Sequence, residues 1–367
     1  MNVGPAGGSR AVAEEPVFFL SDPWIGTCLE TWPGRARFER MEVPCADGYG
    51  GHVLIGRGVE TRHRLLRIPV IAINESTHPL LDETTIELNG IIDRPSSEFE
   101  SGFRALLPTL QCDGSWGELR FSGLPRQSAE QVAALAEANG LRTRLFRERP
   151  TYWVDLDLVR QRFEGDYLAS RSSNTREQLR RSLRAAKKDL GEVALRPAAS
   201  THEALRWLDD LAPLHRARWP SRGQATGFDN KLFVEFHRRL ITRSFDRGAV
   251  ELLRLDAGDA CLAYLYNFRW HARTYFYLSA IDYARAERYR PGMLAHWLAI
   301  ERALASGDRS YDLLAGEHVY KERLATHQDL QRDLVLWRPR MTLRLENTLR
   351  GIRRRWRYGR LPKDKSA

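Results

Sequence analysis

A short stretch after residue 315 places a carboxylate, an imidazole, a phenol and an amine within a few positions of one another. The preceding segment 311–315 (YDLLA) is apolar enough for a short buried strand, and Gly316 allows the chain to turn away from its end. Carboxylate and imidazole groups can act as general bases, because modest burial holds the pKa of either near neutrality. The stretch therefore predicts the edge of a reaction site, although the solvated first turn of a helix over 318–324 would contain the same residue types. The four candidate catalytic residues are Glu317, His318, Tyr320 and Lys321.

A second stretch, 289–297 (YRPGMLAHW), has the features of a site for phosphate groups. Proline suits the first turn of a helix, and glycine beside it lets a ligand approach the free backbone N–H groups of the helix start. Arg288 and Arg290 flank this turn and can pair with phosphate oxygens. The alternative is a plain helix cap at Pro291 and Gly292.

A third candidate lies in 214–219 (LHRARW), where two residues four apart share one face of a helix. The polar loop 220–228 that follows is of the kind that lines acceptor pockets. We therefore take His215 and Trp219 as candidate substrate-binding residues, with a structural histidine as the alternative. The histidines are not spaced for a metal, and no Walker loop or catalytic serine motif is present in the sequence.

The elements that position these residues occur in the same order twice along the chain. Residues 51–125 are predicted to form strand, strand, helix and strand, and residues 248–316 repeat that order. A new strand opens near residue 150. The sequence therefore predicts two α/β domains, 21–150 and 151–337, with mixed, mainly antiparallel sheets flanked by helices.

An inserted helix is predicted over 173–191. Its apolar stripe recurs at helical spacing, and a basic face from Arg176 to Lys188 lies opposite. This face is either solvated or a surface for phosphates of a cofactor or substrate. The stripe consists of Leu179, Leu183, Ala186 and Leu190.

The positive charge of the chain is concentrated at its C-terminal end. The net charge is +10, and residues 338–367 contain eleven Lys or Arg and two acids, which leaves +1 for the rest. This segment is predicted as a basic amphipathic helix that either lies on an anionic membrane or docks on the protein's own sheet. Its apolar face consists of Met341, Leu345, Leu349, Ile352 and Trp356.

Cysteine spacing and hydropathy indicate where the protein works. The four cysteines are scattered without a CxxC pair, which favours reduced thiols in a cytoplasm. No apolar run approaches the roughly 18 residues of a membrane span, and residues 1–20 are predicted to be a flexible tail. We expect a cytoplasmic protein, with a peripheral position at the inner face of the cell membrane if the C-terminal helix binds lipid.

Taken in order, the stretches 174–193, 211–219, 288–307 and 311–325 resemble the GNAT acyltransferase superfamily. The resemblance is strongest to its double-domain branch, the cellulose-biosynthesis (CelD/BcsL-type) acetyltransferases, whose relatives are the Fem-type peptidyltransferases. It covers roughly residues 20–337 and implies two tandem GNAT-like domains, the second of which binds acetyl-CoA or another acyl-CoA.

The resemblance also implies roles for residues of the second domain. Backbone groups of 274–282 (TYFYLSAID) would pair with the pantetheine amides and polarise the thioester carbonyl. Lys321 would assist acyl transfer, as the corresponding lysine does in the Fem-type relatives. The candidate cofactor-binding residues are Leu278, Ser279, Ala280, Arg288, Arg290, Pro291, Gly292 and Met293.

The function expected from these observations is transfer of an acetyl group from acetyl-CoA to a hydroxyl or amine of a saccharide-containing acceptor in cell-envelope or exopolysaccharide synthesis, without a metal. Two alternatives remain open. A Fem-like enzyme would take aminoacyl groups from charged tRNA, whose phosphates could meet the basic face of 173–191, although the near-neutral body favours this less. A non-catalytic scaffold would attach a biosynthetic complex to the membrane.

Overall fold

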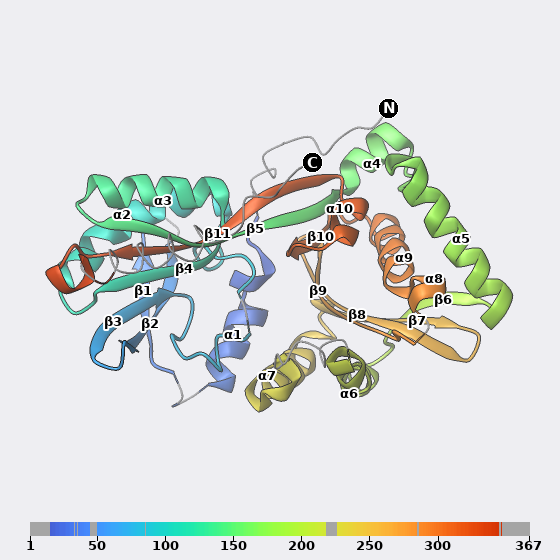
Figure 1. Ribbon diagram of the computed structural model, residues 1–367, viewed down its shortest axis with the longest axis horizontal. Helices are drawn as coiled ribbons and strands as arrows, with labels where there is room; N and C mark the ends of the chain where they lie inside the picture. Colours follow the sequence, from blue (N-terminus) through green and yellow to red (C-terminus); the bar gives the residue numbers. More distant parts are fainter. Residues whose placement is uncertain are drawn as a thin grey trace, which may run out of the picture.

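A mixed β-sheet extends through both lobes of the molecule (Figure 1). The computed structural model describes residues 15–32, 34, 36–44, 50–84, 86–217, 226–284, 286–344 and 346. Within these residues the sheet has eleven strands in the order β1-β2-β3-β4-β11-β5-β10-β9-β8-β7-β6. The strands are β1 (Phe38–Val43), β2 (Gly51–Arg62), β3 (Leu66–Ile73), β4 (Glu118–Pro125), β5 (Arg142–Asp155), β6 (Val193–Pro197), β7 (Val250–Ala257), β8 (Ala260–Trp270), β9 (Arg273–Ile281), β10 (Ser310–Ala315) and β11 (His327–Trp337).

Helices pack on the sheet in both lobes (Figure 1). Successive residues of β7 point to opposite faces, so Leu252 joins a core under α1, α6 and α7, whereas Leu253 joins a second core under α5 and α9. A third core lies under α2 and α3 in the first lobe. The helices are α1 (Asp22–Thr31), α2 (Phe99–Cys112), α3 (Arg126–Ala138), α4 (Leu156–Phe163), α5 (Ser173–Leu190), α6 (Thr201–Ala217), α7 (Lys231–Ser244), α8 (Ala286–Tyr289), α9 (Pro291–Ala305) and α10 (Val319–Leu324).

The repeated element order is confirmed, and the pairing of the strands repeats as well. In the first lobe, β3 and β4 form a short parallel ladder that starts with Val70 opposite Glu118. In the second lobe, β9 and β10 form a parallel ladder of the same length that starts with Arg273 opposite Ser310. In each case a helix, α2 or α9, connects the two preceding strands to the strand that closes the ladder. Each lobe is therefore one α/β unit of the same kind.

Two long strands cross the expected boundary between the units. The sequence predicts a new strand near residue 150, but β5 begins at Arg142 and passes through Pro150. Strand β11 pairs with β5 along its whole length and with β4 on its other edge, so Leu330 lies opposite Pro150 and Leu334 opposite Phe121. Both lobes are thus joined through the centre of one sheet (Figure 1).

The beginning and the end of the described chain are also packed. The predicted N-terminal tail is too long, because Val17 to Leu20 are buried in the core under α1 and α7. Near the other end, Leu343 is 3% exposed and packs against Ile68 and Val70 of the first lobe. Of the described residues, none belongs to a helix long and apolar enough to cross a membrane.

Candidate functional site

Strands β9 and β10 diverge after a short parallel start. Their ladder runs from Arg273 opposite Ser310 to Tyr275 opposite Asp312, whereas β9 continues to Ile281. Strand β10 pairs with β5 on its other edge, where Leu314 adopts a left-handed conformation (φ 59°) at a register shift. The edge of β9 beyond Tyr275 therefore faces an opening instead of β10.

A cavity of about 180 Å³ occupies this opening. It is bounded by the end of β9, the first turn of α9 and the start of α10. A volume of this size holds a slender chain, since pockets for drug-sized ligands measure about 300–1,000 Å³. The lining residues are Ser279, Ile281, Tyr283, Arg290, Pro291, Gly292, Met293, His296 and Tyr320.

The first turn of α9 forms one end of the cavity. Arg290 precedes the helix in a left-handed conformation (φ 48°), and Pro291 occupies the first helical position. A Cβ atom added to Gly292 would lie 2.6 Å from Cδ1 of Ile281, so glycine is what permits the close approach of the helix start to β9. Pro291 has no N–H group and the N–H of Met293 donates to the carbonyl oxygen of Arg290 at 3.0 Å, so it is chiefly the positive end of the helix dipole that suits this end of the cavity to a phosphate or carboxylate.

Lys321 follows the lining residue Tyr320 in the chain but does not itself line the cavity. Its side chain is 5% exposed, so the alternative that it is a solvated residue of the helix is wrong. The Nζ atom donates a 2.7 Å hydrogen bond to the carbonyl oxygen of Ala315 and lies 6.0 Å from the ring centroid of Phe276. The helix α10 is only six residues long, and the turn at Gly316 (φ 141°) folds it back so that the ammonium reaches the end of β10.

Three aromatic rings stack beside the cavity. The ring of Tyr320 stacks on that of His296, with centroids 5.3 Å apart, and the ring of His318 stacks on that of Tyr320, with centroids 5.7 Å apart. His296 is buried, and Nδ1 of its ring lies 3.2 Å from the hydroxyl oxygen of Tyr311. Burial, together with the nearby Lys321 ammonium, lowers the pKa of His296 to about 3.

Most of the predicted cofactor residues line the cavity, whereas several other predicted residues do not. Arg288 instead forms a 2.7 Å ion pair with Asp189 at the end of α5. The side chains of Leu278 and Ala280 point into the core under α6 and α7, and the role predicted for their backbone groups stays a prediction. Among the predicted catalytic residues, Tyr320 lines the cavity, whereas Glu317, His318 and Lys321 do not. The predicted cofactor residues that line it are Ser279, Arg290, Pro291, Gly292 and Met293.

The predicted acceptor residues are not brought to the cavity by the described structure. His215, near the end of α6, packs its ring against Phe228 at a centroid distance of 5.2 Å and does not line the cavity. Trp219 lies outside the described residues.

Three lining residues escaped the sequence analysis: Ile281, Tyr283 and His296. His296 follows Gly292 by four positions, which places both on one face of α9. That spacing was available in the sequence and would have connected His296 with the predicted phosphate turn.

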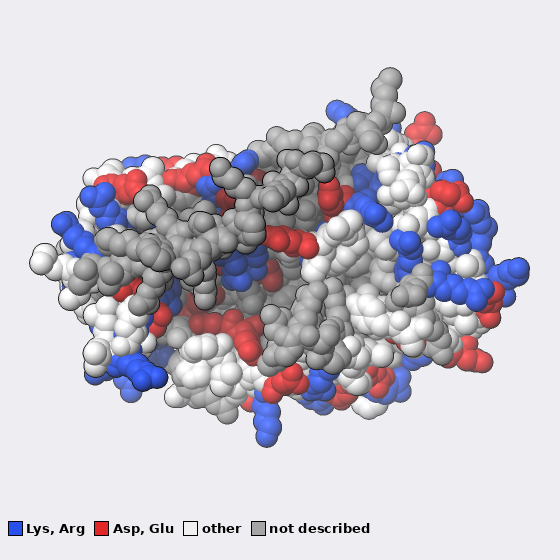
Figure 2. All heavy atoms as spheres, viewed as in Figure 1, with Lys and Arg blue, Asp and Glu red and all other residues white. Residues whose placement is uncertain are grey.

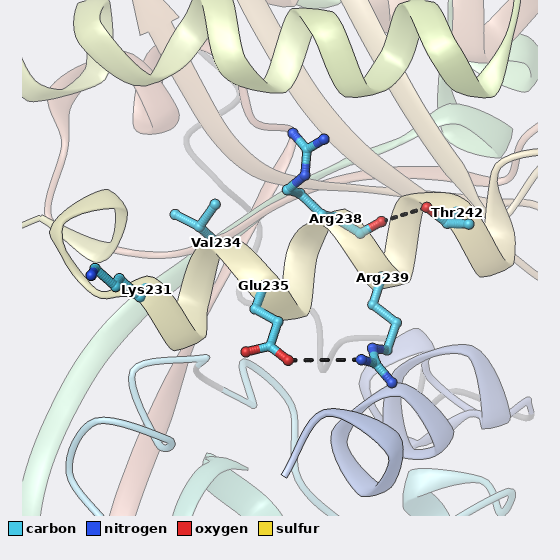
Figure 3. A pocket seen from close by; sticks show the side chains of 6 residues that line it. All are labelled: Lys231, Val234, Glu235, Arg238, Arg239 and Thr242. Atoms are coloured by element: carbon cyan, nitrogen blue, oxygen red, sulfur yellow. Dashed lines mark hydrogen bonds and ion pairs between the residues drawn. The ribbon is translucent and has the colours of Figure 1, made fainter.

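A second depression lies on the outer surface of α7 and has different properties (Figure 3). Its side chains are engaged with one another or with neighbours, for example Glu235 with Arg239 at 3.7 Å. The hydroxyl of Thr242 donates to the carbonyl oxygen of Arg238 at 2.9 Å within the same helix. The one carboxylate that lines it, Glu235, faces Arg239, and we do not assign a function to this surface. The lining residues are Lys231, Val234, Glu235, Arg238, Arg239 and Thr242.

The opening between β9 and β10 is suited to a particular kind of ligand. A parallel strand pair that opens beside a helix N-terminus can hold an extended anionic ligand, with the end of β9 along one side. Residues 173–322 match the sequence model of a family described as "Acetyltransferase (GNAT) domain". This range contains β9, α9, β10 and Lys321, and it supports acyl transfer as the class of reaction.

Solved structures show the same fold at low sequence identity. The protein described as FemX superposes with a TM-score of 0.56 and 10% identity, over 88% of this chain and 92% of that chain. A conserved protein of unknown function from Bacteroides thetaiotaomicron gives a TM-score of 0.52 and 8% identity, over 89% of this chain and 92% of that chain. A comparison with curated protein sequences finds no match. The predicted GNAT-like α/β fold is therefore confirmed, whereas the CelD/BcsL branch stays a prediction.

Proposed function

We propose that the protein is an acyltransferase that uses a coenzyme A thioester as donor, with acetyl-CoA as the first candidate. The acceptor is a hydroxyl or amine of a saccharide-containing compound. The observation that carries the proposal is the cavity between the end of β9, the first turn of α9 and Tyr320, beside which the next residue, Lys321, is buried. A CoA thioester has matching chemistry, because it joins a pyrophosphate to a reactive carbonyl through a long amide arm. The GNAT match of residues 173–322 supports the donor class.

In the proposed reaction the acceptor attacks the thioester carbonyl directly. A new C–O or C–N bond forms, the C–S bond breaks, and CoA leaves as the thiol after taking up the proton that the acceptor loses. Negative charge develops on the carbonyl oxygen, where backbone N–H groups of β9 and the ammonium of Lys321 would stabilise it. Neither of the two proposed bases lines the cavity, and we favour His318 because it is half-buried and stacks on the lining residue Tyr320, whereas Glu317 is exposed.

The donor assignment is tested by ligand-induced stabilisation. A ligand that binds only the folded state at 100 times its Kd stabilises it by about 2.7 kcal/mol, so saturating acetyl-CoA should raise the melting temperature. Gly292→Ala should abolish this rise, because the new methyl group pushes the Ile281 side chain into the cavity. The displaced atom is the end of a flexible side chain, so the unliganded variant should still fold.

Gly114→Ala is the matched control, since a Cβ atom at Gly114 meets nothing within 4 Å. This variant should respond to acetyl-CoA as the wild type does. A wild-type melting curve that no CoA species shifts would contradict the donor assignment and favour the scaffold alternative.

An aminoacyl-tRNA donor is the second candidate, and the surface of α5 favours it. Lys and Arg side chains gather over the end of the second lobe where α5 lies (Figure 2). Arg180, Arg181 and Lys188 of this helix are exposed and available to a polyanion such as tRNA. If charged tRNA is the donor, ribonuclease treatment should remove transferase activity, whereas with acyl-CoA as donor it should have no effect.

A further inference from the structure

The wall of the cavity contains a buried imidazole to which the proposed reaction assigns no task. His296 lies on α9, lines the cavity and is 2% exposed. Its ring lies between the stacked ring of Tyr320 and the edge-on ring of Phe276, whose centroid is 4.3 Å away. Contacts from β9 and α10 therefore hold the imidazole in one orientation.

The hydroxyl of Tyr311 lies behind the ring of His296. Nδ1 of His296 lies 3.2 Å from the hydroxyl oxygen of Tyr311, and which of the two groups donates depends on the tautomer of the imidazole. When the Tyr311 O–H donates to Nδ1, the neutral imidazole carries its proton on Nε2.

The imidazole is neutral at physiological pH. Burial is the main cause that lowers the pKa of His296, and the ammonium of Lys321 is the charged group that adds to it. The other titratable neighbours, Tyr311 and Tyr320, are phenols that are uncharged near neutrality. A neutral, buried imidazole is a poor base at this pH, but it remains a hydrogen-bond donor that is costly to leave unpaired.

We propose that the Nε2–H group of His296 donates a hydrogen bond to a carbonyl oxygen of an acyl-CoA arm bound in this cavity. The inference rests on the proposed function. Carbonyl oxygens are the acceptors that such an arm offers, two in the pantetheine amides and one in the thioester. His296 would thus fix the arm between the helix start that receives the phosphates and the ammonium of Lys321.

Binding measurements on wild type and variants test this role. Titration calorimetry gives the Kd of CoA and of acetyl-CoA for the wild type, for His296→Phe, which keeps an aromatic ring, and for His296→Gln, whose amide nitrogen is as many bonds from Cβ as Nε2 is. We expect His296→Phe to weaken binding about tenfold, the effect of losing one buried hydrogen bond, and His296→Gln to retain most of the affinity. Exposed His202, changed to Phe, is the control and should bind as the wild type does.

The two ligands locate the partner. An equal loss for CoA and acetyl-CoA assigns the hydrogen bond to a pantetheine amide, and a loss for acetyl-CoA alone assigns it to the thioester carbonyl. Melting temperatures without ligand verify that each variant folds, and His296→Met replaces His296→Phe if the latter does not.

Three outcomes would overturn the inference. If the wild type binds CoA and the non-donor variant binds equally well, His296 makes no such bond and the proposed function stands. If His296→Gln loses as much affinity as the non-donor variant, the ring shape matters and the donor does not. If the wild type binds no CoA species, the proposed function fails together with the inference.

Discussion

Lys321 combines a positive charge with nearly complete burial, which is uncommon for this residue type. A buried ammonium needs hydrogen-bond acceptors, and the carbonyl oxygen of Ala315 at 2.7 Å is one of them. The ammonium also interacts electrostatically with the buried carboxyl of Glu87, where it opposes the rise in pKa that burial causes. In the proposed reaction an ammonium here would favour a transition state in which a carbonyl oxygen becomes negative.

Replacing Lys321 by Met should therefore slow the reaction more than it weakens donor binding. We expect kcat, measured as release of the CoA thiol at saturating acetyl-CoA and acceptor, to fall about a hundredfold, as when one oxyanion donor is lost. The melting temperature should also fall, because the carbonyl group of Ala315 loses its donor. Lys187→Met on the exposed face of α5 is the control and should leave kcat unchanged. Normal turnover by Lys321→Met would exclude a role for this residue in the transition state.

His237 makes stability depend on pH in the weakly acidic range. Burial lowers the pKa of this histidine, which is packed among the rings of Phe233, Phe236 and Tyr277, to about 3. Below pH 6.5 the unfolded chain binds a proton at this residue and the folded chain does not, so stability is lost as the pH falls from 6.5 toward 3. The loss approaches about 1.4 kcal/mol per pH unit for one such histidine.

His237→Phe should reduce this slope between pH 6.5 and 5, and urea unfolding at a series of pH values measures it. His296 contributes a slope of the same sign and should keep part of the dependence in the variant. Exposed His202→Phe should leave the slope unchanged. An identical slope for His237→Phe and the wild type would show that His237 becomes protonated without unfolding.

At the scale of the elements, the sequence predicts those helices and strands whose formation depends on residues close together in the chain. The strand–strand–helix–strand order and the helix start at Pro291 are local properties, and both are confirmed. The helix 173–191 is confirmed as α5, with Leu179 and Ala186 buried as its stripe predicts. The burial of Lys321 could not be predicted, because it depends on contacts with Phe276 and Ala315. The residues next to Lys321 in the sequence are those of an exposed helix and do not indicate these contacts.

The turn between β7 and β8 illustrates a contact between elements distant in sequence. Gly258 has a positive φ of 55°, and an added Cβ atom would lie 2.0 Å from the carbonyl oxygen of Leu190 at the end of α5. Gly248 also has a positive φ, 70°, but its added Cβ atom would meet nothing within 4 Å. The two glycines share the conformational requirement and differ in the approach of another backbone.

Gly258→Ala should therefore destabilise the protein more than Gly248→Ala. The left-handed conformation costs a non-glycine residue about 1–2 kcal/mol, which both variants bear, and the clash at Leu190 adds about 1–3 kcal/mol of overpacking to the first. Urea unfolding of the two variants and the wild type measures the difference. Equal destabilisation would mean that α5 moves away from the turn at no cost.

At the scale of the whole molecule, the sequence indicates two units but does not reveal how they share strands. Residues of β11 follow the second unit in sequence, and nothing in their composition indicates pairing with β4, some 200 positions earlier. The division into domains 21–150 and 151–337 therefore stays a prediction, although the expected boundary falls inside β5.

The C-terminal segment allows a test of membrane association. Its beginning is fixed to the first lobe, because Leu343 is buried and Glu346 lies 3.3 Å from Arg62. Met341, which the apolar stripe includes, is 85% exposed, and the stripe's other residues lie outside the described part of the chain. Each basic residue near an anionic lipid surface contributes about 1 kcal/mol.

We expect the full chain to sediment with anionic vesicles at low salt and a chain ending at Glu346 to stay in the supernatant. Ending there keeps the contacts of Leu343 and Glu346 with the first lobe, so a difference reports on residues 347–367 alone. Neutral vesicles are the control and should bind neither form. If both forms remain in the supernatant with anionic vesicles, the membrane proposal is wrong.

The shared strands have a consequence for how the protein is made. On the ribosome, β4 is synthesised long before β11, its neighbour in the sheet. At about 5–20 residues per second, some 200 residues of delay leave the inner edge of β4 without its partner for roughly 10–40 s. During that time the nascent first lobe presents an open sheet edge, which other chains can pair with. Newly made protein should thus depend on chaperones until translation passes Trp337, after which β11 can pair with β4 and β5.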